Sequence, residues 1–143
     1  MANKNLIINS DMKLEHKIIG LLICIGQEQS MKVARSLRHL KLSYTQVNIL
    51  GTLAHGEKGQ LTVSQIKRLM IDESPNISRA LNKLVEKGYV TKERSLTDQR
   101  VVYISITSEG REILKSAIDI LLKISINLPH DDLKKLYDLL RNF

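Results

Sequence analysis

The spacing of apolar residues changes abruptly along this chain, and that change limits the possible fold more than any other feature. Residues 62–69 and 74–87 carry apolar side chains at the intervals of amphipathic helices, with a period of about 3.6. Residues 89–94 and 100–106 instead alternate with a period of about 2, as strands do. The pattern therefore predicts two short helices followed by a β-hairpin, which has to pack on helices because two strands alone are only marginally stable.

Local signals mark where several helices begin. Ser43–Gln46 and Thr62–Gln65 are both capping boxes, in which a hydroxyl and an amide side chain satisfy backbone N–H groups reciprocally. Ser74 followed by Pro75 is typical of a helix start, with Ser as the N-cap and Pro in the first helical position. Thr107 is predicted to cap a further helix after the hairpin.

Helices are also expected on both sides of this central part. Residues 11–29 lack proline and become apolar on nearly every side toward their end, and a shorter basic helix is expected at 32–41. A long helix with a broad apolar stripe is predicted at about 107–127, and Pro129 separates it from a last helix at 131–140. Because a helix that is apolar all round has to be buried, and so short a chain cannot cover 11–29 alone, a partner chain is indicated.

The composition fits one globular domain, with 143 residues of which 43% are apolar. Lys and Arg number 22 against 15 Asp and Glu, a net charge of +7 that favours an anionic partner, either nucleic acid or an acidic membrane surface. With 4 Tyr, 1 Phe and no Trp, the chain is poor in the aromatic side chains on which single-stranded bases stack. The single cysteine excludes an internal disulfide and a multi-cysteine zinc site, and it fits a cytoplasmic setting.

The second of the two short helices has a polar face suited to duplex DNA. Asn76, Arg79 and Lys83 share one stripe of this helix, and Asn can bond adenine, and Arg guanine, with two hydrogen bonds each. Ser74, Asn76 and Ser78 lie at the helix start, where unpaired N–H groups and the positive end of the dipole favour a phosphate. This stripe alone leaves two alternatives open, DNA contact and an ordinary solvated face.

The predicted hairpin adds positive charge beside that helix. Lys92, Arg94 and Arg100 lie near its ends, and an Arg in such a place suits the narrow, negative minor groove. Asp98 would repel DNA, so we expect it to hold the Arg100 guanidinium by a bidentate ion pair. The alternative is a surface hairpin whose ion pair contributes nothing.

Taken together, these segments resemble the MarR family of transcription regulators. The wing signature is Asp98-Gln-Arg100, followed by Ile104–Gly110 with the pattern aliphatic-Thr-x-x-Gly at the start of a helix. The upstream segments that resemble the helix-turn-helix of the family are Leu61–Ile66, Ser74–Arg79 and Leu84–Val90. The resemblance runs through about residues 40–112, and the flanking helices agree in order and length but not in motif.

The resemblance implies a homodimer whose N- and C-terminal helices interlock, and an operator that is pseudo-palindromic, with half-sites about one helical turn (~34 Å) apart. It places Arg100, held by Asp98, in the minor groove, and it favours repression over activation. The residues expected to bind DNA, most of them in the major groove, are Ser74, Asn76, Ser78, Arg79, Asn82, Lys83, Arg94 and Arg100.

The expected fold is mainly α with a small β-hairpin wing, a winged helix-turn-helix flanked by dimerisation helices. Residues 1–10 are expected to be a flexible N-terminus, and 11–42 the N-terminal helices of the dimer region and the junction. Residues 43–107 make the winged helix-turn-helix, and 108–143 the C-terminal dimerisation helices.

Regulation is marked less clearly in the sequence. Many members of the family bind small phenolic or anionic effectors between the dimer region and the DNA-binding lobe. We expect four residues of this chain near that junction, Arg38, His39, Tyr44 and His55. They fit an ordinary solvent-exposed surface equally well. Some members sense peroxide through a cysteine in the first helix, but Cys24 lies mid-helix between two isoleucines, which favours a small buried side chain over a sensor thiol. The histidines are scattered, so no metal site and no cofactor is expected.

Other classes of protein fit this sequence less well than a regulator does. A winged helix can serve as a protein-interaction module that has lost DNA affinity, which predicts weak binding with a shallow salt dependence. An enzyme is not expected, because the chain lacks a Gly-rich phosphate loop, a nucleophile elbow and metal-ligand spacing. No apolar run approaches the ~20 residues of a membrane span, and no signal-peptide cleavage site follows residues 13–25.

Overall fold

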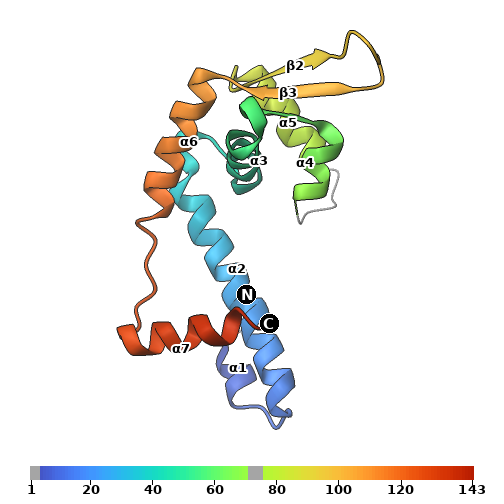
Figure 1. Ribbon diagram of the computed structural model, residues 1–143. Helices are drawn as coiled ribbons and strands as arrows, with labels where there is room; N and C mark the ends of the chain where they lie inside the picture. Colours follow the sequence, from blue (N-terminus) through green and yellow to red (C-terminus); the bar gives the residue numbers. More distant parts are fainter. Residues whose placement is uncertain (1–3, 71–75) are drawn as a thin grey trace.

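The computed structural model describes residues 4–70 and 76–143. Figure 1 shows a lobe of helices capped by a small sheet, and a long helix, α2, that leads away from this lobe toward both termini. The elements, in chain order, are α1 (Lys4–Ile8), α2 (Leu14–Ser36), the 3₁₀ turn η1 (Arg38–Leu40), α3 (Tyr44–His55), the 3₁₀ turn η2 (Glu57–Gly59), β1 (Gln60–Thr62), α4 (Val63–Leu69), α5 (Asn76–Glu86), β2 (Val90–Arg94), β3 (Val102–Ile106), α6 (Ser108–Leu121) and α7 (His130–Leu140).

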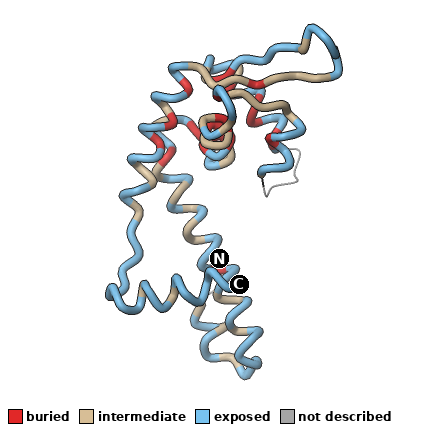
Figure 2. The backbone as a smooth tube through the Cα atoms, in the orientation of Figure 1, coloured by how far each residue is buried: buried red, intermediate tan, exposed pale blue. Residues whose placement is uncertain are grey.

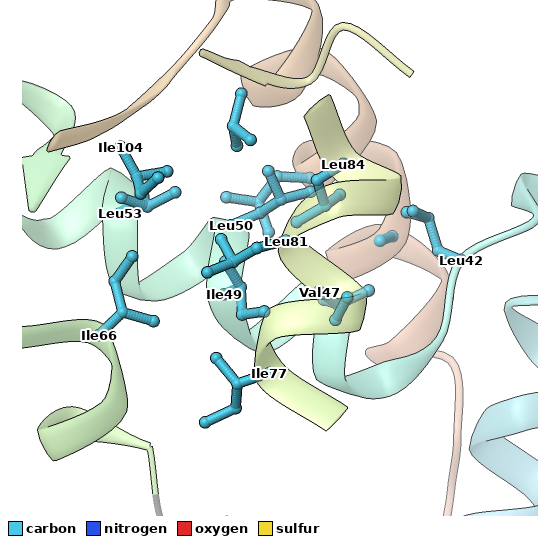
Figure 3. Packing of buried hydrophobic residues seen from close by; sticks show 14 of the residues in the cluster. Leu42, Val47, Ile49, Leu50, Leu53, Ile66, Ile77, Leu81, Leu84 and Ile104 are labelled. Carbon is cyan, nitrogen blue, oxygen red and sulfur yellow. The ribbon is translucent and has the colours of Figure 1, made fainter. Parts of the chain in front are cut away.

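The hydrophobic core lies in the lobe, as the buried segments in Figure 2 show. Helix α3 is its centre, because it contacts α4, α5, α6 and the sheet. Leu50 and Leu53 of α3 are fully buried and belong to the same cluster as Leu81 and Leu84 of α5, which Figure 3 shows at close range. This shared core fixes the orientation of α5, because its apolar stripe can pack only inward.

The sheet has three antiparallel strands in the order β1-β3-β2. Pairing of β2 with β3 confirms the predicted hairpin, with Val90 opposite Ile106. The expectation of only two strands was incomplete, because β1 pairs with the other edge of β3 and places Leu61 opposite Ile104. A strand of three residues is too short to show the alternation of apolar and polar side chains that marks a strand. Its partner strand lies about 40 positions further along the chain, so the local sequence pattern could not reveal β1.

Two expectations for the N-terminal part were wrong. The helices expected at 11–29 and 32–41 are one helix, α2, which continues to Ser36 and then tightens into η1. No proline or glycine interrupts residues 27–36, so nothing breaks the helix there. The expected frayed end contains α1, which folds back on α2: a Cβ on Gly20 would lie 3.2 Å from Ile7 Cδ1, and Lys4 Nζ lies 2.7 Å from Glu28 Oε2.

The C-terminal helix predicted to reach about residue 127 ends at Leu121, which is another correction. Ile124 and Ile126 are β-branched, and Ser125 and Asn127 also have low helix propensity, so the segment gains little from continuing the helix. Ile126 is 55% exposed and Ile124 only partly buried, so packing adds little to offset that low propensity. The last helix is found at His130–Leu140, directly after Pro129.

Within residues 4–70 and 76–143, no helix combines the length and the apolar content that crossing a bilayer requires.

Candidate nucleic-acid interface

Helix α5 has one buried and one exposed face, as its sequence predicts. Ile77, Leu81 and Leu84 are at most 1% exposed and pack into the lobe. The polar residues predicted on the other face are all exposed: Asn76, Ser78, Arg79, Asn82 and Lys83. Ser74, which belongs to the same prediction, lies outside the described residues.

The end of α5 turns the chain directly into the sheet. Gly88 has a φ of 73°, in the left-handed region that glycine tolerates best. The Gly88 N–H donates to the Val85 carbonyl at 2.9 Å, and the Tyr89 N–H donates to the Leu84 carbonyl at 3.0 Å. These two bonds close the helix in a Schellman-type turn, so β2 starts two residues later, beside α5.

One hydrogen bond joins the exposed face of α5 to the hairpin. The Lys92 ammonium group on β2 donates to Asn82 Oδ1 at 2.7 Å. The sequence placed Lys92 near a hairpin end but gave it no role. No local signal could have revealed the pair, since the turn at Gly88 brings the two residues together.

The loop between β2 and β3 is ordered by Asp98, but not in the predicted way. Its Oδ1 accepts a hydrogen bond of 2.9 Å from the backbone N–H of Arg100, and no ion pair joins the two side chains within residues 4–70 and 76–143. Ser95 Oγ accepts from the backbone N–H of Thr97 and of Asp98, each at 3.2 Å. The expected guanidinium clamp is therefore wrong: a short carboxylate so close in sequence reaches the backbone N–H first, in an Asx-type turn. Arg100 and Arg94 are both exposed.

The base of the hairpin explains the pattern Thr-x-x-Gly. Thr107 Oγ1 donates to the Gly88 carbonyl at 2.8 Å and accepts from the Gly110 N–H at 3.0 Å, so one hydroxyl caps α6 and holds the end of α5. A Cβ on Gly110 would lie 2.1 Å from the Tyr89 carbonyl oxygen, a distance that no side chain can occupy. In the same turn, a hydrogen bond from its own backbone N–H and a second from Ser108 lower the pKa of Glu109.

The residues predicted at the junction are not brought together. Tyr44 lines an open cleft of about 700 Å³ between α3, the end of α4 and α6, together with Leu69, Leu114 and Ile118. Arg38 lines a different groove, beside α5. His55 borders a smaller cleft of about 380 Å³, and its Nδ1 lies 2.7 Å from the Gly51 carbonyl oxygen.

Cys24 is 5% exposed, although Ile23 and Ile25 on either side of it are 57% and 43% exposed. The burial agrees with a small apolar side chain, as the sequence favoured. No group of three or more potential His, Cys, Asp or Glu metal ligands occurs within the described residues.

Helices α4 and α5, which follow each other in the chain, and a hairpin that extends beside α5 have the arrangement of a winged helix. The sequence comparisons agree with this geometry. Residues 31–117 match the family described as Transcriptional regulator SarA/Rot. The organic hydroperoxide resistance transcriptional regulator of Bacillus subtilis (strain 168) is 30% identical over 109 residues, which are 76% of this chain and 73% of the relative. The HTH-type transcriptional regulator SarZ of Staphylococcus saprophyticus is 27% identical over 135 residues, 93% of this chain and 91% of the relative.

Solved structures of the same fold include a mutant MarR from E. coli in complex with operator DNA. It superposes with a TM-score of 0.73 at 22% identity, over 92% of this chain and 98% of that chain. The fold is therefore that of the MarR winged-helix regulators, which confirms the resemblance found in the sequence. The chain itself belongs to the SarA/Rot family of transcriptional regulators.

Proposed function

We propose that this protein is a sequence-specific regulator that binds double-stranded DNA as a homodimer and has no enzymatic activity of its own. The observation that carries the proposal is the exposed polar face of α5, held on a rigid core beside the basic hairpin. An α-helix fits the major groove, where Asn and Arg side chains discriminate base edges. Arg100 at the far end of the hairpin is placed to reach the minor groove or the backbone.

Exposed apolar side chains outside the lobe support the homodimer. Ile19 and Ile23 of α2 are 52% and 57% exposed, and Leu139 and Phe143 near the C-terminus are 70% and 87% exposed. Figure 2 shows hardly any buried residues in the part of the molecule formed by α1, α7 and the half of α2 beside them. Large apolar side chains exposed in such number on neighbouring stretches of helix are typical of a protein–protein interface. A second copy of the chain would cover it and present the two α5 helices to one pseudo-palindromic operator.

The experiment is selection of bound fragments from a random duplex library, followed by affinity measurements at several salt concentrations. The proposal predicts one enriched, two-fold symmetric sequence and a steep loss of affinity with salt. Uniform weak binding with a shallow salt dependence would instead support a protein-interaction module that has lost its DNA affinity. We propose that repression is the outcome in the cell and that the protein acts in the cytoplasm, by analogy with regulators that block promoters.

An effector site is a second candidate, and the cleft of about 700 Å³ favours it. Its apolar lining between α3 and α6 lies where the lobe meets the helices that lead to the dimer region, so a small aromatic or anionic ligand could change the spacing of the lobes. Titration with aromatic acids, read out as release of the selected duplex, tests this candidate. A ligand that binds without releasing DNA would contradict it.

Redox sensing through Cys24 is the weaker alternative. It is supported by the name of the B. subtilis relative, an organic hydroperoxide resistance regulator. The burial of Cys24 works against it, because a sensor thiol has to meet its oxidant. An unchanged DNA affinity after treatment with an organic hydroperoxide, in both the native protein and Cys24→Ser, would exclude it.

A further inference from the structure

A basic groove runs along the flank of α5 that faces away from the hairpin. It lies between α5 and the turn that joins α2 to α3, it is open to solvent, and its volume is about 780 Å³. One carboxylate, Glu86, lines it against five cationic side chains, which are Arg38, Lys41, Arg79, Lys83 and Lys87. Only Arg79 and Lys83 belong to the DNA-binding face predicted from sequence, so the other three form a cationic surface that the helix-turn-helix alone does not explain.

The wall of the groove opposite α5 is a fixed turn. Lys41 has a φ of 54°, a left-handed conformation that is unusual for a residue other than glycine. The Lys87 ammonium group donates to the Lys41 carbonyl, which ties this turn to the end of α5. Directly after it, Ser43 and Gln46 form the capping box that starts α3. The groove is therefore already formed in the protein by itself.

A buried amide lines the same groove. Gln46 is only 4% exposed, and its Oε1 accepts from the Ser43 N–H at 2.9 Å. Within residues 4–70 and 76–143, its Nε2 donates to no acceptor. Buried polar groups are normally hydrogen-bonded, so a donor left over in a groove lined by cations points to an anionic occupant that brings acceptor oxygens.

The position of the groove beside α5 indicates which kind of anion it binds. Arg79 and Lys83 line the groove and also belong to the exposed face of α5, so an occupant has to be continuous with whatever α5 binds. A helix in the major groove lies between two sugar-phosphate backbones. The other flank of α5 already carries Lys92, bonded to Asn82, and the hairpin beyond it. An open groove bordered by five cationic side chains suits an extended chain of phosphates better than a small enclosed anion.

We propose that this groove binds the sugar-phosphate backbone on the side of the major groove away from the hairpin. Arg38, Lys41 and Lys87 then make sequence-independent contacts to phosphates, and α5 is held between two clamps, the groove and the hairpin. The proposal rests on the DNA-binding function proposed above and adds contacts that determine affinity and register but not sequence preference.

The test is the double variant Arg38→Gln/Lys41→Asn, because Asn tolerates the left-handed backbone at position 41. Lys87 is left intact, since its ammonium group also ties the turn to α5. Affinity is measured for the selected duplex and for a scrambled duplex of the same composition, over a range of salt concentrations. Lys115→Gln, which removes an exposed charge from α6, is the matched control, and circular dichroism checks the fold.

The proposal predicts that the double variant loses affinity for both duplexes by the same factor. The slope of log K against log salt should fall by about 0.9 for each phosphate contact removed, and Lys115→Gln should leave it unchanged. A folded double variant with an unchanged slope would overturn the groove proposal while specific DNA binding by the native protein stands. A selective loss of the preferred sequence would also overturn it, because those residues would then read bases. If the native protein shows no preference for any duplex, the proposed function itself fails.

Discussion

Lys92 on β2 and Asn82 on α5 are joined by a hydrogen bond of 2.7 Å from the ammonium group to Asn82 Oδ1. The bond links the helix that we expect in the major groove to the hairpin beside it. It also engages Asn82 Oδ1, so a DNA base has to compete with Lys92 for this oxygen, whereas Nδ2 is not engaged by that bond. Bidentate pairing with adenine needs both atoms, so this bond favours a base edge that presents only acceptors, such as guanine, or a phosphate.

Lys92→Met should therefore change the base preference at the position read by Asn82. Without the ammonium group the amide can turn, and adenine should become acceptable there. The measurement is binding to a set of duplexes with each of the four bases at every operator position, with Lys115→Met as the control. An unaltered preference profile would show that the bond does not orient Asn82 toward DNA.

Arg79→Ala and Asn76→Ala should relax sequence preference, because both side chains are exposed on the face of α5 expected in the major groove. Each lost base contact should cost about 1–3 kcal/mol at one operator position and little elsewhere. Competition between the selected duplex and single-base variants measures this. Equal weakening for all sequences would mean that these residues contact phosphate.

Arg100→Ala should weaken operator binding by about 1–3 kcal/mol and leave the oligomeric state intact. The reason is the exposed place of Arg100 at the end of the hairpin, where the Asp98 carboxylate orders its backbone but does not neutralise its guanidinium. Fluorescence anisotropy at physiological salt is the measurement. Asp98→Ala provides a second variant: it should weaken binding less, by loosening the loop. Unchanged affinity in Arg100→Ala would remove the wing from the interface.

Ile23→Glu should shift the protein from dimer to monomer at micromolar concentration. Ile23 is 57% exposed on α2, and a carboxylate placed in an apolar interface lacks a partner, at a cost of about 3–5 kcal/mol. Leu96→Glu, a similar change at a fully exposed position in the loop of the hairpin, is the control and should remain dimeric. Light scattering decides the outcome, and a native protein that is monomeric at this concentration would refute the dimer outright.

Gly110→Ala should lower the free energy of unfolding by about 2–3 kcal/mol or more, because the new methyl group meets the Tyr89 carbonyl oxygen at 2.1 Å. Gly51→Ala is the matched control. A Cβ there meets nothing within 4 Å, and the substitution should raise stability by up to about 1 kcal/mol. Urea denaturation of both variants is the test. Equal stabilities for the two would show that the base of the wing can adjust to a side chain.

Several features were predictable from sequence because they depend on residues within one or two turns of each other. Both capping boxes form as predicted. The apolar stripe of α5 is buried and its polar stripe exposed, since a helix with that spacing can bury only one face. Gly88 ends α5 because glycine tolerates the left-handed backbone at that position. Thr107 begins α6 because its side chain accepts a hydrogen bond from the Gly110 N–H. Both effects depend only on residues that are close in sequence.

Contacts between segments far apart in the chain were decided only by the tertiary structure. The pairing of β1 with β3, the bond from Lys92 to Asn82 and the groove between α5 and the turn before α3 all depend on how the helices pack around α3. The ends of α2 and α6 also escaped prediction, because helix ends depend on small differences in propensity that packing can outweigh. The sequence by itself thus determined the winged helix and its candidate DNA-binding face, since periodicity and caps are local. The packing of elements that are distant in sequence decided which polar groups contact one another around that face. Local sequence patterns contain no information about such contacts.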